Sequence, residues 1–122
     1  LHLYKPIREI GDKYGVTHRL LRFYEEQGFL RPVREGERRY FTPEDEKVLS
    51  MILQAKRLGL TLKEIGYRLK RGETHIEVDV DTLAERAGIF EVDAREKANI
   101  AAHIRATLSL HNGDVVVIGD AA

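Results

Sequence analysis

Positively charged side chains gather at the start of one predicted helix, where they could contact the bases and phosphates of a nucleic acid. The helix follows Thr17, a residue type that caps helices, and its first turns carry His18, Arg19 and Arg22. Arginine can form two hydrogen bonds with O6 and N7 of guanine, or it can clamp a phosphate. His18 leaves two interpretations open, a base contact or an exposed polar residue at a helix start. The chemistry that this segment favours is contact with double-stranded DNA, and its predicted DNA contacts are Thr17, His18, Arg19 and Arg22.

A second cationic group follows in a predicted β-hairpin. Residues 31–41 read RPVREGERRYF, and Gly36 lies between flanks that suit two short strands. Beside a groove-binding helix, such a hairpin could place cations against phosphates or in the minor groove. A solvated turn is the alternative, because Glu35 and Glu37 lie in the same segment. The predicted contacts in the hairpin are Arg34, Arg38, Arg39 and Tyr40.

A third candidate group flanks Gly59. Lys56, Arg57 and Lys63 surround this predicted turn and could grip another phosphate, although a solvated turn fits the sequence equally well. Arg57 and Lys63 are the predicted DNA contacts of this group.

The elements that must position these side chains begin with a predicted helix-turn-helix. One helix is expected over residues 6–14, with Gly15 in the left-handed conformation that ends helices. A second is expected over residues 17–27, ended by Gly28. So tight a turn between two helices is typical of DNA-binding proteins, and the hairpin that follows would be their wing.

Two further helices are predicted after the hairpin. Residues 42–45 form a strong helix start, and residues 61–64 form a capping box. These helices should end near Gly59 and Gly72. The fold class expected is mainly α, a winged helix-turn-helix with a small hairpin wing.

The last third of the chain carries two weaker signals. Residues 75–81 and 115–118 suit short strands, and the pattern leaves open whether they pair with each other or across a dimer. A helix is expected over residues 93–111, and it would need a partner surface to be stable. Its predicted dimerisation residues recur at spacing four: Ile100, Ile104 and Leu108.

Composition bounds the possibilities. The chain has 122 residues and no cysteine, which excludes disulfides, thiolate metal sites and cysteine nucleophiles. Residues 1–73 contain 16 Lys and Arg against 11 Asp and Glu, a net of +5, whereas residues 74–122 contain 4 against 9, a net of −5. Only the front part suits a polyanion. No apolar run approaches the length of a membrane span, so a cytoplasmic protein without membrane contact is expected.

The stretch from Tyr4 to about Lys70 resembles the DNA-binding domain of the MerR family of transcriptional regulators. The resemblance is carried in order by Ile7-Arg8-Glu9-Ile10, Gly15-Val16-Thr17, LRFYEEQGFLRP at 21–32, GERRY at 36–40 and RLGLTLKEI at 57–65. It implies a DNA-binding domain over residues 1–72, and a linker with a short dimerisation region over residues 73–122.

The same resemblance implies roles for individual residues. Arg19 would contact the major groove, Arg22 and Tyr24 would contact the DNA backbone, and Arg38, Arg39 and Tyr40 would contact DNA from the wing. Family members bind pseudo-palindromic promoters as homodimers and distort them so that RNA polymerase can engage. Metal- and redox-sensing members use cysteines, which this chain lacks, and drug-sensing members have a large C-terminal domain for which it has no room.

Other functions remain as alternatives. An architectural or excisionase-like protein would use a similar fold to bend DNA, and a protein-interaction adaptor would have lost DNA binding. A metal site is a third alternative, formed from His75, Glu77, Asp79 and Asp81, or from His103 and His111. No metal or cofactor is expected, and no motif of an enzyme is found in the sequence.

Overall fold

A computed structural model describes residues 3–92 and 94–119, apart from the side chains of residues 94–96. The chain divides into two compact units, residues 1–50 and 51–122. The division falls inside the third helix, α3 (Pro43–Arg57), ahead of the boundary at residue 72 that the sequence suggested. Each unit has its own buried core.

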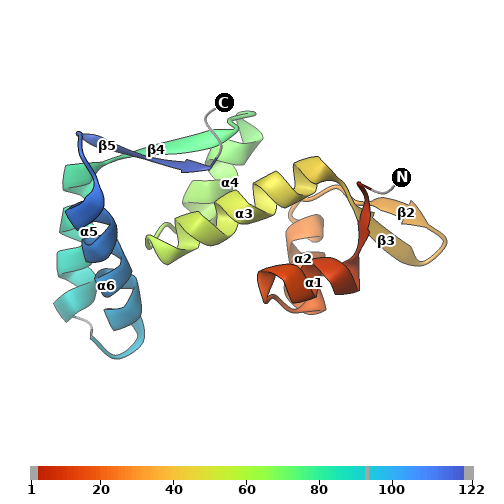
Figure 1. Cartoon of the computed structure of the whole chain (residues 1–122), viewed down its shortest axis with the longest axis horizontal. Helices are drawn as coiled ribbons and strands as arrows, with labels where there is room; N and C mark the ends of the chain where they lie inside the picture. Colours follow the sequence, from red (N-terminus) through yellow and green to blue (C-terminus); the bar gives the residue numbers. More distant parts are fainter. Residues whose placement is uncertain (1–2, 93, 120–122) are drawn as a thin grey trace. The chain divides into compact units, whose positions relative to one another are not determined.

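The first unit is a helix-turn-helix with a small antiparallel sheet (Figure 1). In the sheet, β3 lies between β1 and β2. The elements are β1 (Lys5–Pro6), α1 (Ile7–Tyr14), α2 (His18–Glu26), β2 (Val33–Glu35), β3 (Arg38–Phe41) and the start of α3. The predicted helices and hairpin are confirmed, whereas β1 was not predicted. A strand of two residues leaves too short a pattern to recognise.

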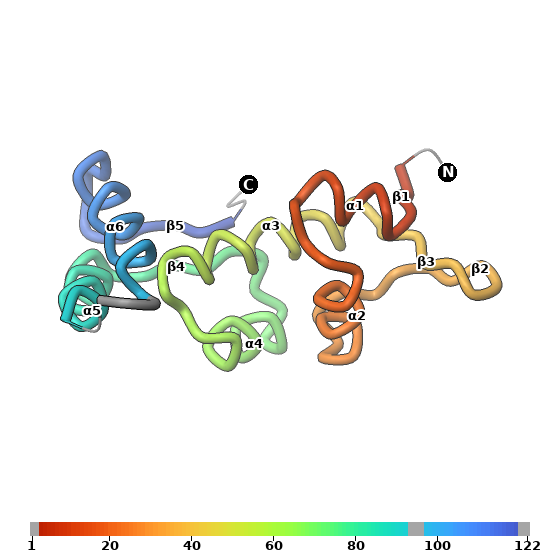
Figure 2. The backbone as a smooth tube through the Cα atoms, turned by 90° about the horizontal axis from the view of Figure 1, so that it is seen from below, coloured from red at the N-terminus to blue at the C-terminus, as the bar shows by residue number. Residues whose placement is uncertain are grey.

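Glycine ends α1 as the sequence predicted. Gly15 has a φ of 66°, in the left-handed region, and its N–H donates to the carbonyl of Gly11. The chain then turns into α2, as the trace in Figure 2 shows. The core beneath these helices is apolar and fully buried: Ile10, Leu21, Tyr24, Leu30, Phe41 and Leu49.

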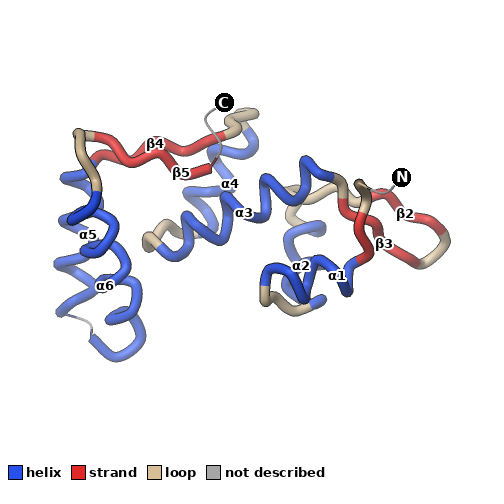
Figure 3. Tube along the Cα trace, in the orientation of Figure 1, coloured by secondary structure: helices blue, strands red, loops and turns tan. Residues whose placement is uncertain are grey.

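The second unit contains the remaining helices and a two-stranded sheet (Figure 3). Its elements are the end of α3, α4 (Leu62–Lys70), β4 (His75–Asp79), α5 (Val80–Val92), α6 (Ala94–Leu110) and β5 (Val115–Gly119). The antiparallel strands β4 and β5 pair within the chain, with Ile76 opposite Ile118. This answers the question of pairing that the sequence left open.

Helices α5 and α6 pack side by side as a helical hairpin, which in the sequence connects β4 to β5. The sequence predicted α6 but not α5, and it extended the first strand to residue 81, two residues too far. Leu83, Ala87 and Ile104 are buried in this unit. Within the described residues, no helix combines the length and the apolar content that crossing a membrane would require.

Candidate nucleic-acid interface

The outer face of α2 carries exposed cations. The Thr17 hydroxyl accepts the N–H of Leu20 at 3.1 Å, which caps the helix as predicted and fixes where its first turn begins. Leu21 is buried, so the other side of the helix faces the core. His18, Arg19 and Arg22 are exposed. The helix therefore presents these side chains together, one turn apart, as the geometry of groove binding requires.

Tyr24 lies in the core, which contradicts the contact with the DNA backbone that the resemblance implied for this residue. Its side chain is 1% exposed, and the hydroxyl is buried without a hydrogen-bond partner among the described residues. Burial raises the pKa of this hydroxyl. The ring lies 6.0 Å from that of Phe23 and 6.4 Å from that of Phe29. Tyr24 follows Leu21 by three residues and so shares its buried face, whereas Phe23 is exposed.

Glu25 connects α2 to the hairpin wing. Its Oε1 accepts a hydrogen bond from Nε of Arg39 at 2.6 Å, and its Oε2 accepts one from a terminal nitrogen of Arg34 at 2.9 Å. Burial alone would raise the pKa of Glu25, but the hydrogen bonds from both arginines outweigh it and lower the pKa. Glu25 is therefore a carboxylate at neutral pH, and it neutralises part of the wing's positive charge.

The predicted wing residues do not form one surface. Arg34 and Arg39 are directly opposite each other in the register of β2 and β3, and both bind Glu25. Because side chains alternate along a strand, Arg38 and Tyr40 point to the other face. Arg38 is exposed and Tyr40 is half-buried. Two of the predicted contacts are thus engaged within the protein, and Arg38 is free to meet solvent.

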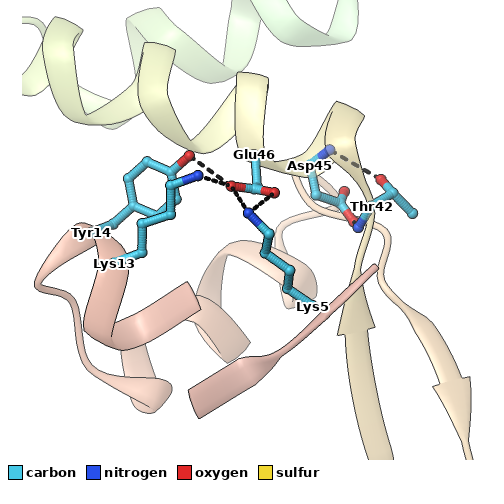
Figure 4. A network of polar contacts seen from close by, with 6 residues as sticks. All are labelled: Lys5, Lys13, Tyr14, Thr42, Asp45 and Glu46. Atoms are coloured by element: carbon cyan, nitrogen blue, oxygen red, sulfur yellow. Dashed lines mark hydrogen bonds and ion pairs between the residues drawn. The ribbon is translucent and has the colours of Figure 1, made fainter. Parts of the chain in front are cut away.

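A carboxylate on α3 holds the first unit together. Glu46 accepts hydrogen bonds from Nζ of Lys13 at 2.8 Å and from the hydroxyl of Tyr14 at 3.0 Å, and it lies 3.3 Å from Nζ of Lys5 (Figure 4). Burial opposes ionisation, but these hydrogen bonds prevail and lower the pKa of Glu46. They also raise the pKa of Lys13. The network joins α1, β1 and α3, and so fixes the support on which α2 rests.

The start of α3 is fixed by reciprocal hydrogen bonds. The hydroxyl of Thr42 accepts the N–H of Asp45 at 3.1 Å, and Oδ2 of Asp45 accepts the N–H of Thr42 at 3.0 Å. The other oxygen of Asp45 accepts the N–H of Arg31 at 2.8 Å. These contacts anchor residues 31 and 42, which flank the hairpin on either side, to one buried carboxylate.

Arg57 and Lys63, the DNA contacts predicted beside the turn between α3 and α4, are both exposed. Gly59 has a φ of 83°, and its carbonyl accepts a hydrogen bond from Arg86 of α5 at 2.8 Å. Arg86 also binds Glu64 through two nitrogens, at 2.8 and 3.1 Å. This pairing lowers the pKa of Glu64 to about 2. Helix α5 therefore braces the turn that carries the third predicted group of cations.

The residues predicted for dimerisation lie in α6, and one of them, Ile104, is buried within the chain itself. Ile104 is 0% exposed, because α5 of the same chain packs against α6. The prediction that Ile104 faces a second protomer is therefore wrong. Ile100 and Leu108 are half-buried. Among the described side chains of this hairpin, the large apolar ones that are exposed are Ile89, Val92 and Leu110.

The acidic and histidine side chains proposed as metal ligands are not gathered. His75, Glu77 and Asp79 share one face of β4, where they alternate with Ile76 and Val78, whereas Asp81 belongs to the first turn of α5. His103 and His111 are both half-buried. Over residues 3–92 and 94–119, no three such side chains come close enough together to hold a metal ion.

Sequence reasoning missed the residues that hold cations in place. Glu25, Glu46 and Arg86 each bind a partner at least 14 positions away along the chain. One signal was available for Glu25. It follows Arg22 by three residues on a face otherwise rich in cations, and an acid there implies a cationic partner rather than a phosphate.

Comparisons with known proteins agree with this geometry. A family profile described as "MerR HTH family regulatory protein" matches residues 6–71. An "Uncharacterized HTH-type transcriptional regulator" of Haemophilus influenzae is 35% identical over 83 residues, which are 66% of this chain and 58% of that protein. The regulator CueR of Salmonella typhi is 34% identical over 62 residues, 49% of this chain and 45% of CueR. The chain spans about half the length of these relatives.

A solved structure is also similar. It is that of HiNmlR, described as a MerR family regulator lacking the sensor domain and bound to promoter DNA. The TM-score is 0.51 and the identity 25%, and the match covers 87% of this chain and 77% of HiNmlR. The similarity therefore extends beyond the helix-turn-helix into the second unit.

Proposed function

The chain belongs to the MerR family of helix-turn-helix regulatory proteins, and we propose that it regulates transcription by binding double-stranded promoter DNA. One observation supports this function above the others. Helix α2 buries Leu21 and exposes Arg19 and Arg22 on its outer face. Among the described residues neither arginine makes an ion pair, and an adaptor that had lost DNA binding would have no need of such arginines there.

Most of the proposed contacts are exposed side chains, and Tyr40 is half-buried. Arg19 and His18 lie at the start of α2, where they would meet base edges in the major groove. Arg22, one turn later, would bind a phosphate. Arg38 would extend the contact from the wing, and Tyr40 with it. Arg57 and Lys63 would grip the backbone from the turn between α3 and α4.

The proposed assembly is a homodimer on a pseudo-palindrome. Two recognition helices would enter successive major grooves about 34 Å apart. Distortion of the intervening DNA would allow RNA polymerase to engage, and the DNA's own stiffness would add to specificity. We attribute no catalytic activity to the chain, and we expect it to work in the cytoplasm.

The test begins with a duplex selected by the wild-type protein from a random library. Replacing both cations, Arg19→Ala with Arg22→Ala, should weaken its binding at least about tenfold, since base-edge contacts by arginine are worth about 1–3 kcal/mol each. The salt dependence should become shallower by about one phosphate contact. Fluorescence anisotropy at several salt concentrations measures both.

The control is Arg105→Ala. It removes one positive charge, against two in the double variant, from α6, where Arg105 pairs with the exposed Glu91 among the described residues. Such exposed pairs contribute little to stability. Equal loss of binding in the control and the double variant, or a wild-type affinity that is insensitive to salt, would refute the proposed function.

A further inference from the structure

We propose that Glu25 positions the wing by holding Arg39, and that Arg34 is the arginine that leaves Glu25 to contact a DNA phosphate. The wing is defined as residues 33–41, comprising β2, β3 and the turn between them. The inference rests on the proposed function. It gives different roles to two arginines that the sequence pattern treats alike.

The need for a carboxylate follows from the register of the strands. Arg34 and Arg39 are cross-strand partners, and like charges directly opposite each other destabilise a sheet. Glu25 gives one oxygen to each arginine, so the repulsion becomes two charge-assisted hydrogen bonds. Both strands of the wing are thereby tied through their side chains to the last turn of α2.

Exposure separates the two arginines. The side chain of Arg39 is 20% exposed, and its Nε lies 2.6 Å from Glu25. The side chain of Arg34 is 55% exposed and bonds through a terminal nitrogen. A phosphate can approach Arg34 from solvent without moving either strand, whereas the side chain of Arg39 is itself largely buried and its Nε makes the shorter hydrogen bond to Glu25. Arg39 therefore acts on DNA only through the position of the wing.

Glu25 should also weaken sequence-independent binding, that is, the affinity of the chain for unrelated DNA. With its charge in place, Arg39 contributes no free cation, and the wing meets the duplex at one angle. Without that charge, both arginines can bind phosphates from several wing positions. Affinity for unrelated DNA should then rise more than affinity for the selected duplex, because phosphate contacts carry no sequence information.

The experiment compares Glu25→Gln with Glu26→Gln. Glu26 is the next residue of α2, is exposed, and makes no ion pair with any residue that the structure describes. Both variants gain the same net charge. Anisotropy titrations use the selected duplex and a shuffled duplex over a range of salt concentrations. Glu25→Gln should lower the ratio of selected to shuffled affinity about fivefold and steepen the salt dependence by about one phosphate contact.

Arg34→Gln and Arg39→Gln test the division of roles. Arg34→Gln should make the salt dependence of binding shallower and leave the ratio of selected to shuffled affinity nearly unchanged. Arg39→Gln should lower the ratio, and adding Glu25→Gln to it should lower the ratio little further, since the two residues act as one unit. Thermal unfolding establishes that each variant is folded.

Each result bears on a separate claim. If the wild-type chain selects no duplex, the proposed function is wrong, whatever the variants do. If the wild type binds but Glu25→Gln behaves like Glu26→Gln, Glu25 does not position the wing. If Arg39→Gln alters the salt dependence and spares the ratio, Arg39 is itself a phosphate contact, and the division of roles is wrong.

Discussion

Individual carboxylates determine where the cations of the first unit lie. Glu46 binds Lys5, Lys13 and Tyr14, and Glu25 binds the wing. Each is a single acid shared by several donors from other elements. Removing one such acid should therefore disturb more than one element at once, which makes these residues sensitive points for stability and for pH dependence.

Glu46→Gln should make the chain less stable at neutral pH and less sensitive to acid. The hydrogen bonds to Glu46 lower its pKa below the ordinary value of 4.5. The contribution of Glu46 to the free energy of unfolding is therefore complete above about pH 4.5, the pKa of this carboxyl in the unfolded chain. That contribution is lost as pH falls through the lower pKa of the same carboxyl in the folded chain. The variant should lose about 1–2 kcal/mol at pH 7 and show a smaller drop between neutral and acidic pH.

Urea unfolding followed by circular dichroism, at neutral and acidic pH, measures this difference. Glu44→Gln is the matched control, because Glu44 shares the first turn of α3 but is exposed and makes no ion pair within the described residues. If Glu44→Gln and Glu46→Gln reduce the free energy of unfolding equally at both pH values, the network contributes nothing specific.

What could be predicted at this scale depended on distance along the chain. The cap by Thr17 and the capping box of Thr61 and Glu64 join residues three positions apart, so the sequence alone predicts them. The ion pair of Glu25 with Arg39 spans 14 positions. Nothing local distinguishes that arginine from Arg38, and only the pleat of the hairpin decides which one faces α2.

At the scale of elements, the α3–α4 turn depends on a helix that the sequence did not predict. An added Cβ at Gly59 would overlap the ring of Phe90 and lie 3.2 Å from Cδ of Arg86, both in α5. Helix α5 was missed because the alternation of residues 75–79 extends into its first turn, and Gly88 interrupts the helical pattern. Its partner helix, α6, has stronger local signals and was predicted.

Gly59→Ala should destabilise the chain more than Gly72→Ala. Both glycines have positive φ, 83° and 77°, so alanine costs about 1–2 kcal/mol at either position. Of these two positions, only Gly59 meets other side chains, because a Cβ at Gly72 would have no described atom within 4 Å apart from its own residue and chain neighbours. Overpacking against Phe90 should add about 1–3 kcal/mol.

Thermal or urea unfolding of the two variants gives the comparison directly. The difference between their free energies of unfolding measures the packing of α5 on the turn, since both variants carry the same cost of alanine at a positive φ. Equal destabilisation would mean that Phe90 and Arg86 move aside freely, and that α5 does not brace the turn that carries Arg57 and Lys63.

At the scale of the whole molecule, charge is divided along the sequence. Residues 1–73 have a net charge of +5 and residues 74–122 a net charge of −5, so the basic part suits DNA and the acidic part does not. The acidic part carries Ile89 and Val92, which are 65% and 88% exposed. Exposed apolar side chains close together often mark a protein interface.

We expect these side chains to contribute to the proposed dimer. Ile89 and Val92 are three residues apart on α5 and so share one side of it. The wild-type chain should have a mass near twice 14.0 kDa by light scattering. Ile89→Lys with Val92→Lys should shift the mass toward 14.0 kDa, because a lysine ammonium resists burial. Val117→Lys, on the exposed face of β5, is the control and should leave the mass unchanged.

The same variants test whether dimerisation determines how the chain binds two DNA half-sites. A dimer that places two α2 helices about 34 Å apart should lose affinity when the half-sites of a selected duplex are moved apart by half a helical turn. The lysine variant should bind a single half-site and become indifferent to that spacing, since each protomer then acts alone. Wild-type binding that ignores the spacing, or a wild-type mass near 14.0 kDa at every concentration, would show that one protomer is the functional unit.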